Sequence, residues 1–146
     1  MSHMTLEYSA NLRPAGRFGD LCRKLAQFMT GLTVDGQPVF PTAGVRVRAI
    51  PCEDYCIADG SVQDAGFVHA ILKIGAGRSD AAKHATRAGL FEIMKEHFAA
   101  QYARQGLALS LEFIEFSESG TLKHNNLHAR FKRAAVRANP GSSESA

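Results

Sequence analysis

The 146-residue sequence has few residues that could cross-link it or hold a metal. Its three cysteines are Cys22, Cys52 and Cys56, an odd number without a recognisable secretory signal, which predicts free thiols in a reducing compartment. No second cysteine pair follows Cys52 and Cys56, so a zinc site is not expected. His124 and His128 are four residues apart, but no glutamate follows His124, so they do not form the HExxH pattern of zinc metalloproteases. We therefore expect no metal.

The sequence also lacks a long hydrophobic run and a dense charge of one sign. No stretch approaches the roughly 20 apolar residues that span a membrane, and the first residues form a strand-like pattern rather than a signal peptide. The formal charge of +3 comes without the basic stripe and interleaved aromatics typical of nucleic-acid binders. We therefore expect a cytoplasmic protein with neither a membrane nor a nucleic acid as its partner.

Two common catalytic signatures are missing as well. The glycines at positions 75 and 77 lack the third glycine of a dinucleotide-binding turn, because position 80 is Asp80. The G-x-S-x-G turn of serine hydrolases is absent. These absences argue against a bound dinucleotide and against a serine-hydrolase triad.

The apolar residues that are present recur with two periods. Alternating residues predict strands, and residues spaced by three and four predict amphipathic helices. Ser79 is a candidate N-cap for the second helix. In order, we expect a strand at 3–8, a helix at 18–32, strands at 45–50 and 67–74, a helix from 79 to about 104, a strand at 107–116 and a short ordered segment at 121–131.

A strand–helix–strand unit therefore occurs twice. Because parallel neighbours need a crossover connection, each helix should join a parallel pair. We predict an α+β fold, with a four-stranded sheet and two helices on one face. It forms a single domain, residues 1–132, followed by a polar tail, residues 133–146. The other sheet face would be bare and apolar, which predicts oligomerisation.

Arginines mark the candidate site. Arg78 follows a glycine turn at a helix start, where backbone N–H groups, the helix dipole and a guanidinium together attract an anion. Arg46 and Arg48 alternate onto one strand face and suit a substrate with carboxylates. Local sequence leaves two alternatives open: Arg78 capping a surface turn, and Arg46 and Arg48 forming ion pairs on an exposed or interface face.

Six short motifs follow one another along residues 1–132. They are Glu7-x-Ser9-x-Asn11, Phe40-Pro41-x-Ala43-Gly44-x-Arg46-x-Arg48, Ala58-Asp59-Gly60, Phe67-Val68-His69, Leu72-Lys73-Ile74-Gly75-Ala76-Gly77-Arg78 and Asn125-Asn126-x-His128-Ala129. Together they resemble the 5-carboxymethyl-2-hydroxymuconate isomerase family of the tautomerase superfamily.

The resemblance implies a tandem β-α-β tautomerase-type fold that assembles as a homotrimer. It also implies a cofactor-independent proton shift, in homoprotocatechuate catabolism, that turns a 2-hydroxymuconate carrying three carboxylates into its 2-oxo isomer. Family members use an N-terminal proline, exposed when Met is removed, as the proton shuttle. Arg46 and Arg78 match the family's arginines, which bind carboxylates and stabilise the developing enolate, and Arg48 matches as a secondary substrate-binding residue.

The chain departs from the family at Ser2, which stands where the proline is expected. Removal of Met1 would leave a primary α-amine, whose ordinary pKa of about 7.7–8.0 should fall beside arginines. That amine could act as the base without the proline ring that fixes its nitrogen. Alternatively, Ser2-His3-Met4 derives from a cloning vector, or the chain is a catalytically impaired member that binds a ligand or a partner.

Overall fold

A computed structural model of the chain describes residues 1–141. Its central sheet has four strands: Ser2–Ser9 (β1), Val45–Cys52 (β4), Gly66–Gly75 (β5) and Leu107–Phe116 (β6). The order across the sheet is β4-β1-β5-β6. β1 runs parallel to β4, and β5 runs parallel to β6, so both predicted crossover units are confirmed. The two units meet where β1 and β5 pair in antiparallel fashion.

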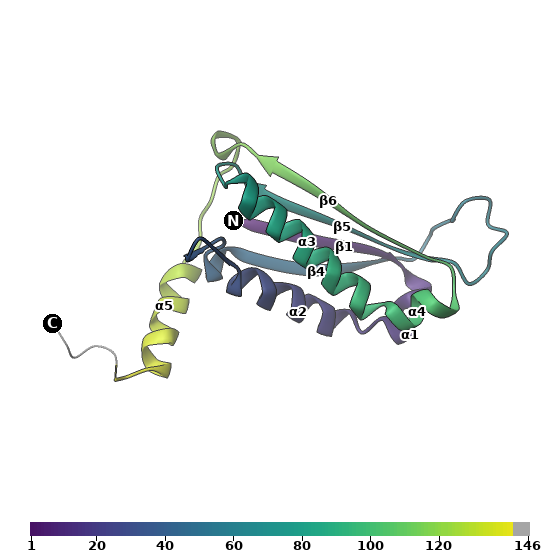
Figure 1. The fold of residues 1–146 in the computed structure, drawn as a ribbon, viewed down its shortest axis with the longest axis horizontal. Coiled ribbons are helices and arrows are strands. Elements are labelled where there is room, and N and C mark those ends of the chain that lie inside the picture. Colours follow the sequence, from purple (N-terminus) through teal and green to yellow (C-terminus); the bar gives the residue numbers. More distant parts are fainter. Residues whose placement is uncertain (142–146) are drawn as a thin grey trace.

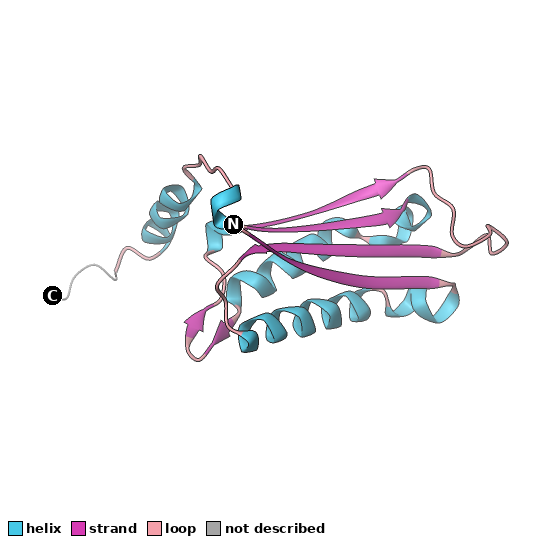
Figure 2. Ribbon diagram, turned by 90° about the horizontal axis from the view of Figure 1, so that it is seen from above, coloured by secondary structure: helices cyan, strands magenta, loops and turns pink. Residues whose placement is uncertain are grey.

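Helices cover one face of this sheet (Figures 1 and 2). Phe18–Gly31 (α2) and Asp80–His97 (α3) lie along the strands, and Ala99–Arg104 (α4) follows α3. Apolar side chains of both long helices and of the sheet's covered face form one buried cluster, which includes Met4, Leu6, Tyr8, Leu21, Leu25, Met29, Val68, Ala70, Leu72, Leu90, Met94 and Phe98. The predicted α+β architecture, with both helices on one face, is therefore confirmed.

Side-chain capping and backbone conformation determine where the helices begin and end. Ser79 is the N-cap of α3, because its Oγ accepts a hydrogen bond of 3.1 Å from the backbone N–H of Ala82. The second helix does not run unbroken to residue 104 as predicted, since Phe98, with φ −99° and ψ 12°, separates α3 from α4. A short helix, Arg13–Gly16 (α1), precedes α2, and Arg17 joins them in a left-handed conformation with φ 44°.

The uncovered face of the sheet is not apolar, contrary to the prediction. Side chains at paired positions share a face, and three rows cross this one. The rows are Arg46–His3–Lys73–Ile114, Arg48–Thr5–Ile71–Glu112 and Ile50–Glu7–His69–Ser110. Each row mixes charged or polar groups with one aliphatic side chain. Hydrophobic burial of this face is therefore a weaker reason for oligomerisation than the sequence pattern indicated.

The remaining elements lie in the predicted connections, except for the last helix, which begins inside the ordered segment predicted at 121–131. They are a two-stranded ribbon, Thr33–Val34 (β2) with Gln37–Pro38 (β3), three 3-10 turns, Ala10–Leu12 (η1), Thr42–Gly44 (η2) and Glu118–Gly120 (η3), and a C-terminal helix, Leu127–Ala138 (α5). The predicted segment 121–131 was expected to close the fold, but α5 instead projects from its body (Figure 1).

The boundary predicted after residue 132 falls inside α5, and residues 142–146 of the predicted tail lie outside the described residues. Within residues 1–141, every helix is too short or too polar to cross a membrane.

Candidate active site at the start of the chain

Strand direction gathers the predicted site residues at one end of the sheet. β1 and β4 begin at this end, whereas β5 and β6 finish there, because β5 is antiparallel to β1. The N-terminus, the start of α3 and the chain leaving β6 consequently lie together (Figure 1). Segments that are far apart in the sequence can therefore contribute side chains to one site.

Ser2 is held inside this end of the sheet. It pairs with Val45 on one side and with Ile74 on the other, and it is 1% exposed. Met1 precedes it, with its Cα next to Gly44: a Cβ atom at position 44 would lie 3.9 Å away. The chain start is thus fixed between two strands and the η2 turn, so an α-amine there has a defined place.

Arg78 is positioned by backbone acceptors and by an aromatic ring. Its Nε donates to the carbonyl of Val39 at 3.0 Å, and its Nη1 donates to the carbonyl of Gly75 at 2.9 Å. The guanidinium carbon lies 4.6 Å from the centre of the Phe40 ring, a cation–π contact. Burial lowers the pKa of Arg78, while Glu115 and Glu118 oppose this shift. A half-buried cation with fixed orientation is well suited to bind a carboxylate.

Arg46 and Arg48 lie on the same face of β4, on the side without helices. Arg46 Nη1 donates to the carbonyl of Ala43 at 3.4 Å, which turns it towards η2 and the chain start. Arg48 Nη1 lies 3.4 Å from His3 Nδ1. Burial lowers the pKa of His3, and the charges of Arg48 and Arg46 lower it further, so the histidine remains neutral beside them at neutral pH.

Sequence reasoning missed two charged residues at this end. Lys123, in the irregular segment between η3 and α5, forms an ion pair with Glu118 of η3. Glu118 in turn rests on β5, because any side chain added at Gly75 would collide with its Oε1 atom. The spacing of positions 118 and 123 gives no sign of this cluster. The nearby Asn125-Asn126-x-His128 motif was the one feature that drew attention to the segment.

These groups act together on the α-amine of the chain. Burial is the largest cause that lowers the pKa of the Met1 amine below its ordinary value of 8.0. The positive charges of Lys123, Arg78 and Arg46 lower it further, whereas Glu118 opposes them. An amine with a depressed pKa is partly unprotonated near neutral pH, as a general base must be. The cations around it would also attract an anionic substrate.

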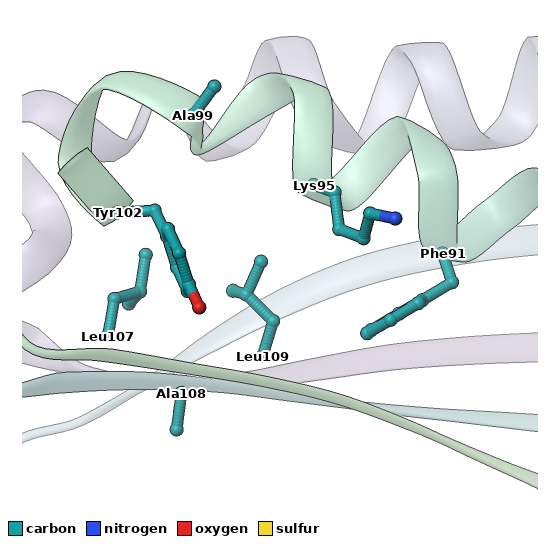
Figure 3. A pocket seen from close by; sticks show the side chains of 7 residues that line it. All are labelled: Phe91, Lys95, Ala99, Tyr102, Leu107, Ala108 and Leu109. Carbon is teal, nitrogen blue, oxygen red and sulfur yellow. The ribbon is translucent and has the colours of Figure 1, made fainter.

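A separate pocket of about 580 Å³ lies between α3, α4 and β6 (Figure 3). Its lining is mostly apolar and includes Phe91, Tyr102 and Leu109. Its one cation, Lys95, already pairs with Glu92 at 2.5 Å. None of the predicted arginines lines it. Within residues 1–141, no three His, Cys, Asp or Glu side chains group to hold a metal ion.

Comparison with known proteins identifies the family. The model of the 5-carboxymethyl-2-hydroxymuconate isomerase family matches residues 2–131. The 5-carboxymethyl-2-hydroxymuconate Delta-isomerase of Escherichia coli is 39% identical over 132 residues, which are 90% of this chain and 100% of that protein. The chain belongs to the 5-carboxymethyl-2-hydroxymuconate isomerase family. The resemblance predicted from the six motifs is confirmed.

Solved structures agree with this family membership. A crystal structure of a 5-carboxymethyl-2-hydroxymuconate isomerase from Deinococcus radiodurans R1 superimposes with a TM-score of 0.81 and 45% identity, covering 89% of this chain and 93% of that one. A fused 4-OT wild-type protein, described as a symmetric trimer, has a TM-score of 0.57 at 16% identity and covers 87% of this chain and 98% of its own. At that identity the likeness concerns the fold alone, which is the predicted tautomerase-type fold.

Proposed function

We propose that the protein is a cytoplasmic, cofactor-independent isomerase that shifts a proton on 5-carboxymethyl-2-hydroxymuconate or a related unsaturated hydroxy or oxo polycarboxylate. The observation that carries the proposal is the buried chain start, where an α-amine of lowered pKa lies among Arg46, Arg78 and Lys123. Membership of the isomerase family supports the reaction type and the substrate class.

The reaction needs one base, one returned proton and cations for the anionic substrate. In our proposal, the unprotonated amine accepts the proton of the substrate's 2-hydroxyl group. The electrons of that O–H bond form the 2-oxo group, the carbon–carbon double bond moves, and the ammonium returns a proton to carbon. No proton or electron is gained or lost overall. Arg78 and Arg46 bind carboxylates and stabilise the enolate charge, with Arg48 secondary.

The amine belongs to Ser2 once Met1 is removed. Ser2 is small, so removal of the initiator Met is expected, and the new α-amine then occupies the position of the family's proline nitrogen. Ser2 lies within the sheet end, and the cations that lower the pKa of the Met1 amine are one residue away, so we expect the pKa of the Ser2 amine to be lowered as well. The ring that would orient a proline nitrogen is absent, and pairing with Val45 and Ile74 is what holds the residue instead.

The proposed assembly is a homotrimer. The fused 4-OT relative in the same fold is described as a symmetric trimer. Among the described residues, the edge strands β4 and β6 each lack a second strand neighbour, and exposed edges of this length favour association. In this proposal, the ring of three protomers covers these edges.

Two measurements, made one after the other, test the proposed function. Mass spectrometry of the purified chain establishes whether Met1 is absent, and ultraviolet absorbance then follows ketonisation of 5-carboxymethyl-2-hydroxymuconate. We expect a chain that begins at Ser2 and a rate above the spontaneous reaction. A chain with a free Ser2 amine that leaves the spontaneous rate of this and related hydroxymuconates unchanged would contradict the proposal.

A further inference from the structure

Three carboxylates must be accommodated if the proposed substrate is right, and two arginines do not suffice. The name 5-carboxymethyl-2-hydroxymuconate denotes a dicarboxylate chain with one carboxymethyl branch. Arg78 and Arg46 lie near the chain start, whereas Arg48 is turned along the uncovered face towards His3. One carboxylate therefore lacks a cation of its own, and Lys123 is the remaining cation that acts on the α-amine.

Contacts connect Lys123 to the site step by step. Lys123 Nζ pairs with Glu118 Oε2, and the other oxygen of this carboxylate lies against Gly75. The carbonyl of Gly75 accepts the hydrogen bond from Arg78 Nη1 at 2.9 Å. Lys123 thus reaches Arg78 through one carboxylate and one residue of β5. The lysine side chain is 32% exposed, so a ligand can approach it.

Glu118 holds a carboxylate against the cations at this end of the sheet. It is the carboxylate that pairs with Lys123, and its pKa is lowered first by that hydrogen bond and further by the charges of the chain's amine and Arg78. An internal carboxylate held by these cations resembles a bound anion. Its side chain is 55% exposed and comes from a short 3-10 turn, so it can move aside at small cost.

We propose that Lys123 is a substrate-binding residue that takes the third carboxylate, and that Glu118 competes with the substrate for it. The assignment rests on the proposed function, since it presumes a tricarboxylate at the chain start. Binding exchanges the Lys123–Glu118 pair for a pair between Lys123 and the ligand, and Glu118 turns to solvent. Lys123 consequently contributes to selecting three carboxylates over two.

Ligands that differ by one carboxylate isolate this contribution. Propane-1,2,3-tricarboxylate and glutarate are titrated by calorimetry into the full-length protein and into Lys123→Met, Lys123→Arg and Glu118→Gln. We expect Lys123→Met to weaken tricarboxylate binding by roughly 10- to 100-fold, the range of a hydrogen bond between charged groups, and to leave glutarate binding nearly unchanged. Lys123→Arg should retain most of the preference, and Glu118→Gln should tighten tricarboxylate binding several-fold.

The matched control is Lys95→Met, which removes another lysine paired with a glutamate, far from the chain start. It should alter neither affinity. KM and kcat for ketonisation provide a second measurement, in which Lys123→Met should raise KM more than it lowers kcat. If Lys123→Met keeps the wild-type preference and KM while ketonisation persists, the assignment of Lys123 is overturned and the isomerase proposal stands. If the wild-type protein neither binds these ligands nor ketonises the substrate, both fail.

Discussion

In the proposed mechanism, the residue at position 2 sets how well the α-amine is positioned for proton transfer. The pyrrolidine ring fixes the orientation of a proline nitrogen. The primary amine of Ser2 has no such ring, although the residue itself is held between Val45 and Ile74. We predict that Ser2→Pro, with Met1 removed, raises the ketonisation rate by up to ~10²-fold, since positioning errors cost about this much. The ultraviolet assay measures it, and mass spectrometry must confirm the free terminus. No gain would mean that the pocket has changed around the serine.

The protonation of the α-amine should govern the rate. Burial and the neighbouring cations lower the pKa of the amine at this end, and only the unprotonated form is a base. We therefore predict that kcat/KM rises with pH and levels off above an apparent pKa lower than the 8.0 of an ordinary chain terminus. Acetylation of the amine should abolish turnover and leave dicarboxylate binding largely intact. Activity that survives complete acetylation would assign the base to another group.

Arg78 should contribute to affinity through its charge. We predict that Arg78→Ala weakens binding of a dicarboxylate by about 1.5–3 kcal/mol, the range for hydrogen bonds to charged groups. Calorimetry with glutarate measures the loss. Arg87→Ala is the control, because Arg87 also lies over a phenylalanine ring, 5.4 Å from the centre of Phe113, but away from the chain start. Equal effects of the two substitutions would show that lost packing, and not a lost anion contact, is responsible.

The residues of the site were predictable to different degrees. Arg46, Arg48 and Arg78 stand out in the sequence because strand alternation and a glycine turn give each a direction. Ser2 stands out through the resemblance to a family that keeps proline there. Lys123 and Glu118 did not stand out, since their proximity to the N-terminus arises only after β6 has returned to the end of the sheet where β1 begins.

Among the elements, the junction of α3 and α1 carries a pH-dependent contact. His97, near the end of α3, is 7% exposed, and its Nε2 lies 2.7 Å from the carbonyl of Gly16. Its Nδ1 is buried without a hydrogen-bond partner among residues 1–141. Burial lowers the pKa of His97, and Lys24 and Arg17 contribute in the same direction, whereas the hydrogen bond to Gly16 and the charge of Asp20 oppose the shift. Protonation would leave a buried N–H at Nδ1 without an acceptor among the described residues.

The unfolded chain consequently binds a proton at His97 more readily than the folded chain does. Stability from this group is fully present above the ordinary histidine pKa of about 6.5 and is lost as the pH falls below it. We predict that His97→Gln, whose amide can still donate to Gly16, reduces the loss of unfolding free energy between about pH 8 and about pH 5.5. Urea unfolding at both pH values measures this. His84→Gln, at an exposed position of α3, is the control; an unchanged difference in the His97 variant would contradict the prediction.

The periodicity of apolar residues predicted the long elements, whereas the features that it missed depend on tertiary contacts. The spacing of apolar residues located α2 and all four sheet strands, because each buries one face. The antiparallel pairing of β1 with β5 has no local signal, since both strands end in loops of many possible directions. The break at Phe98 is equally hidden: the residue fits the apolar stripe of a continuous helix, yet it is fully buried and its ring lies 5.7 Å from that of Phe18.

At the scale of the whole molecule, α5 stands out because it is largely exposed within residues 1–141. Its 12 residues include none that is buried, and Phe131 and Val136 are 51% and 61% exposed. Helices of about 12–15 residues or fewer are marginal when isolated in water. Within residues 1–141, its main contact is with η2, beside the start of β4. This position, next to the edge of the sheet, places α5 where a neighbouring protomer could cover it.

We therefore predict that the protein sediments as a trimer, or as a multiple of three, at micromolar concentration. The physical reason is not an apolar sheet face, since the uncovered face is mixed, but two strand edges and the exposed side chains of α5. A chain that ends at Asn126 should dissociate at a higher protein concentration than the full-length chain, because it lacks α5 while the sheet and its core remain. Sedimentation velocity over a dilution series measures both. A monomeric full-length protein at micromolar concentration would contradict the trimer, and equal dissociation of the two chains would show that α5 lies outside the interface.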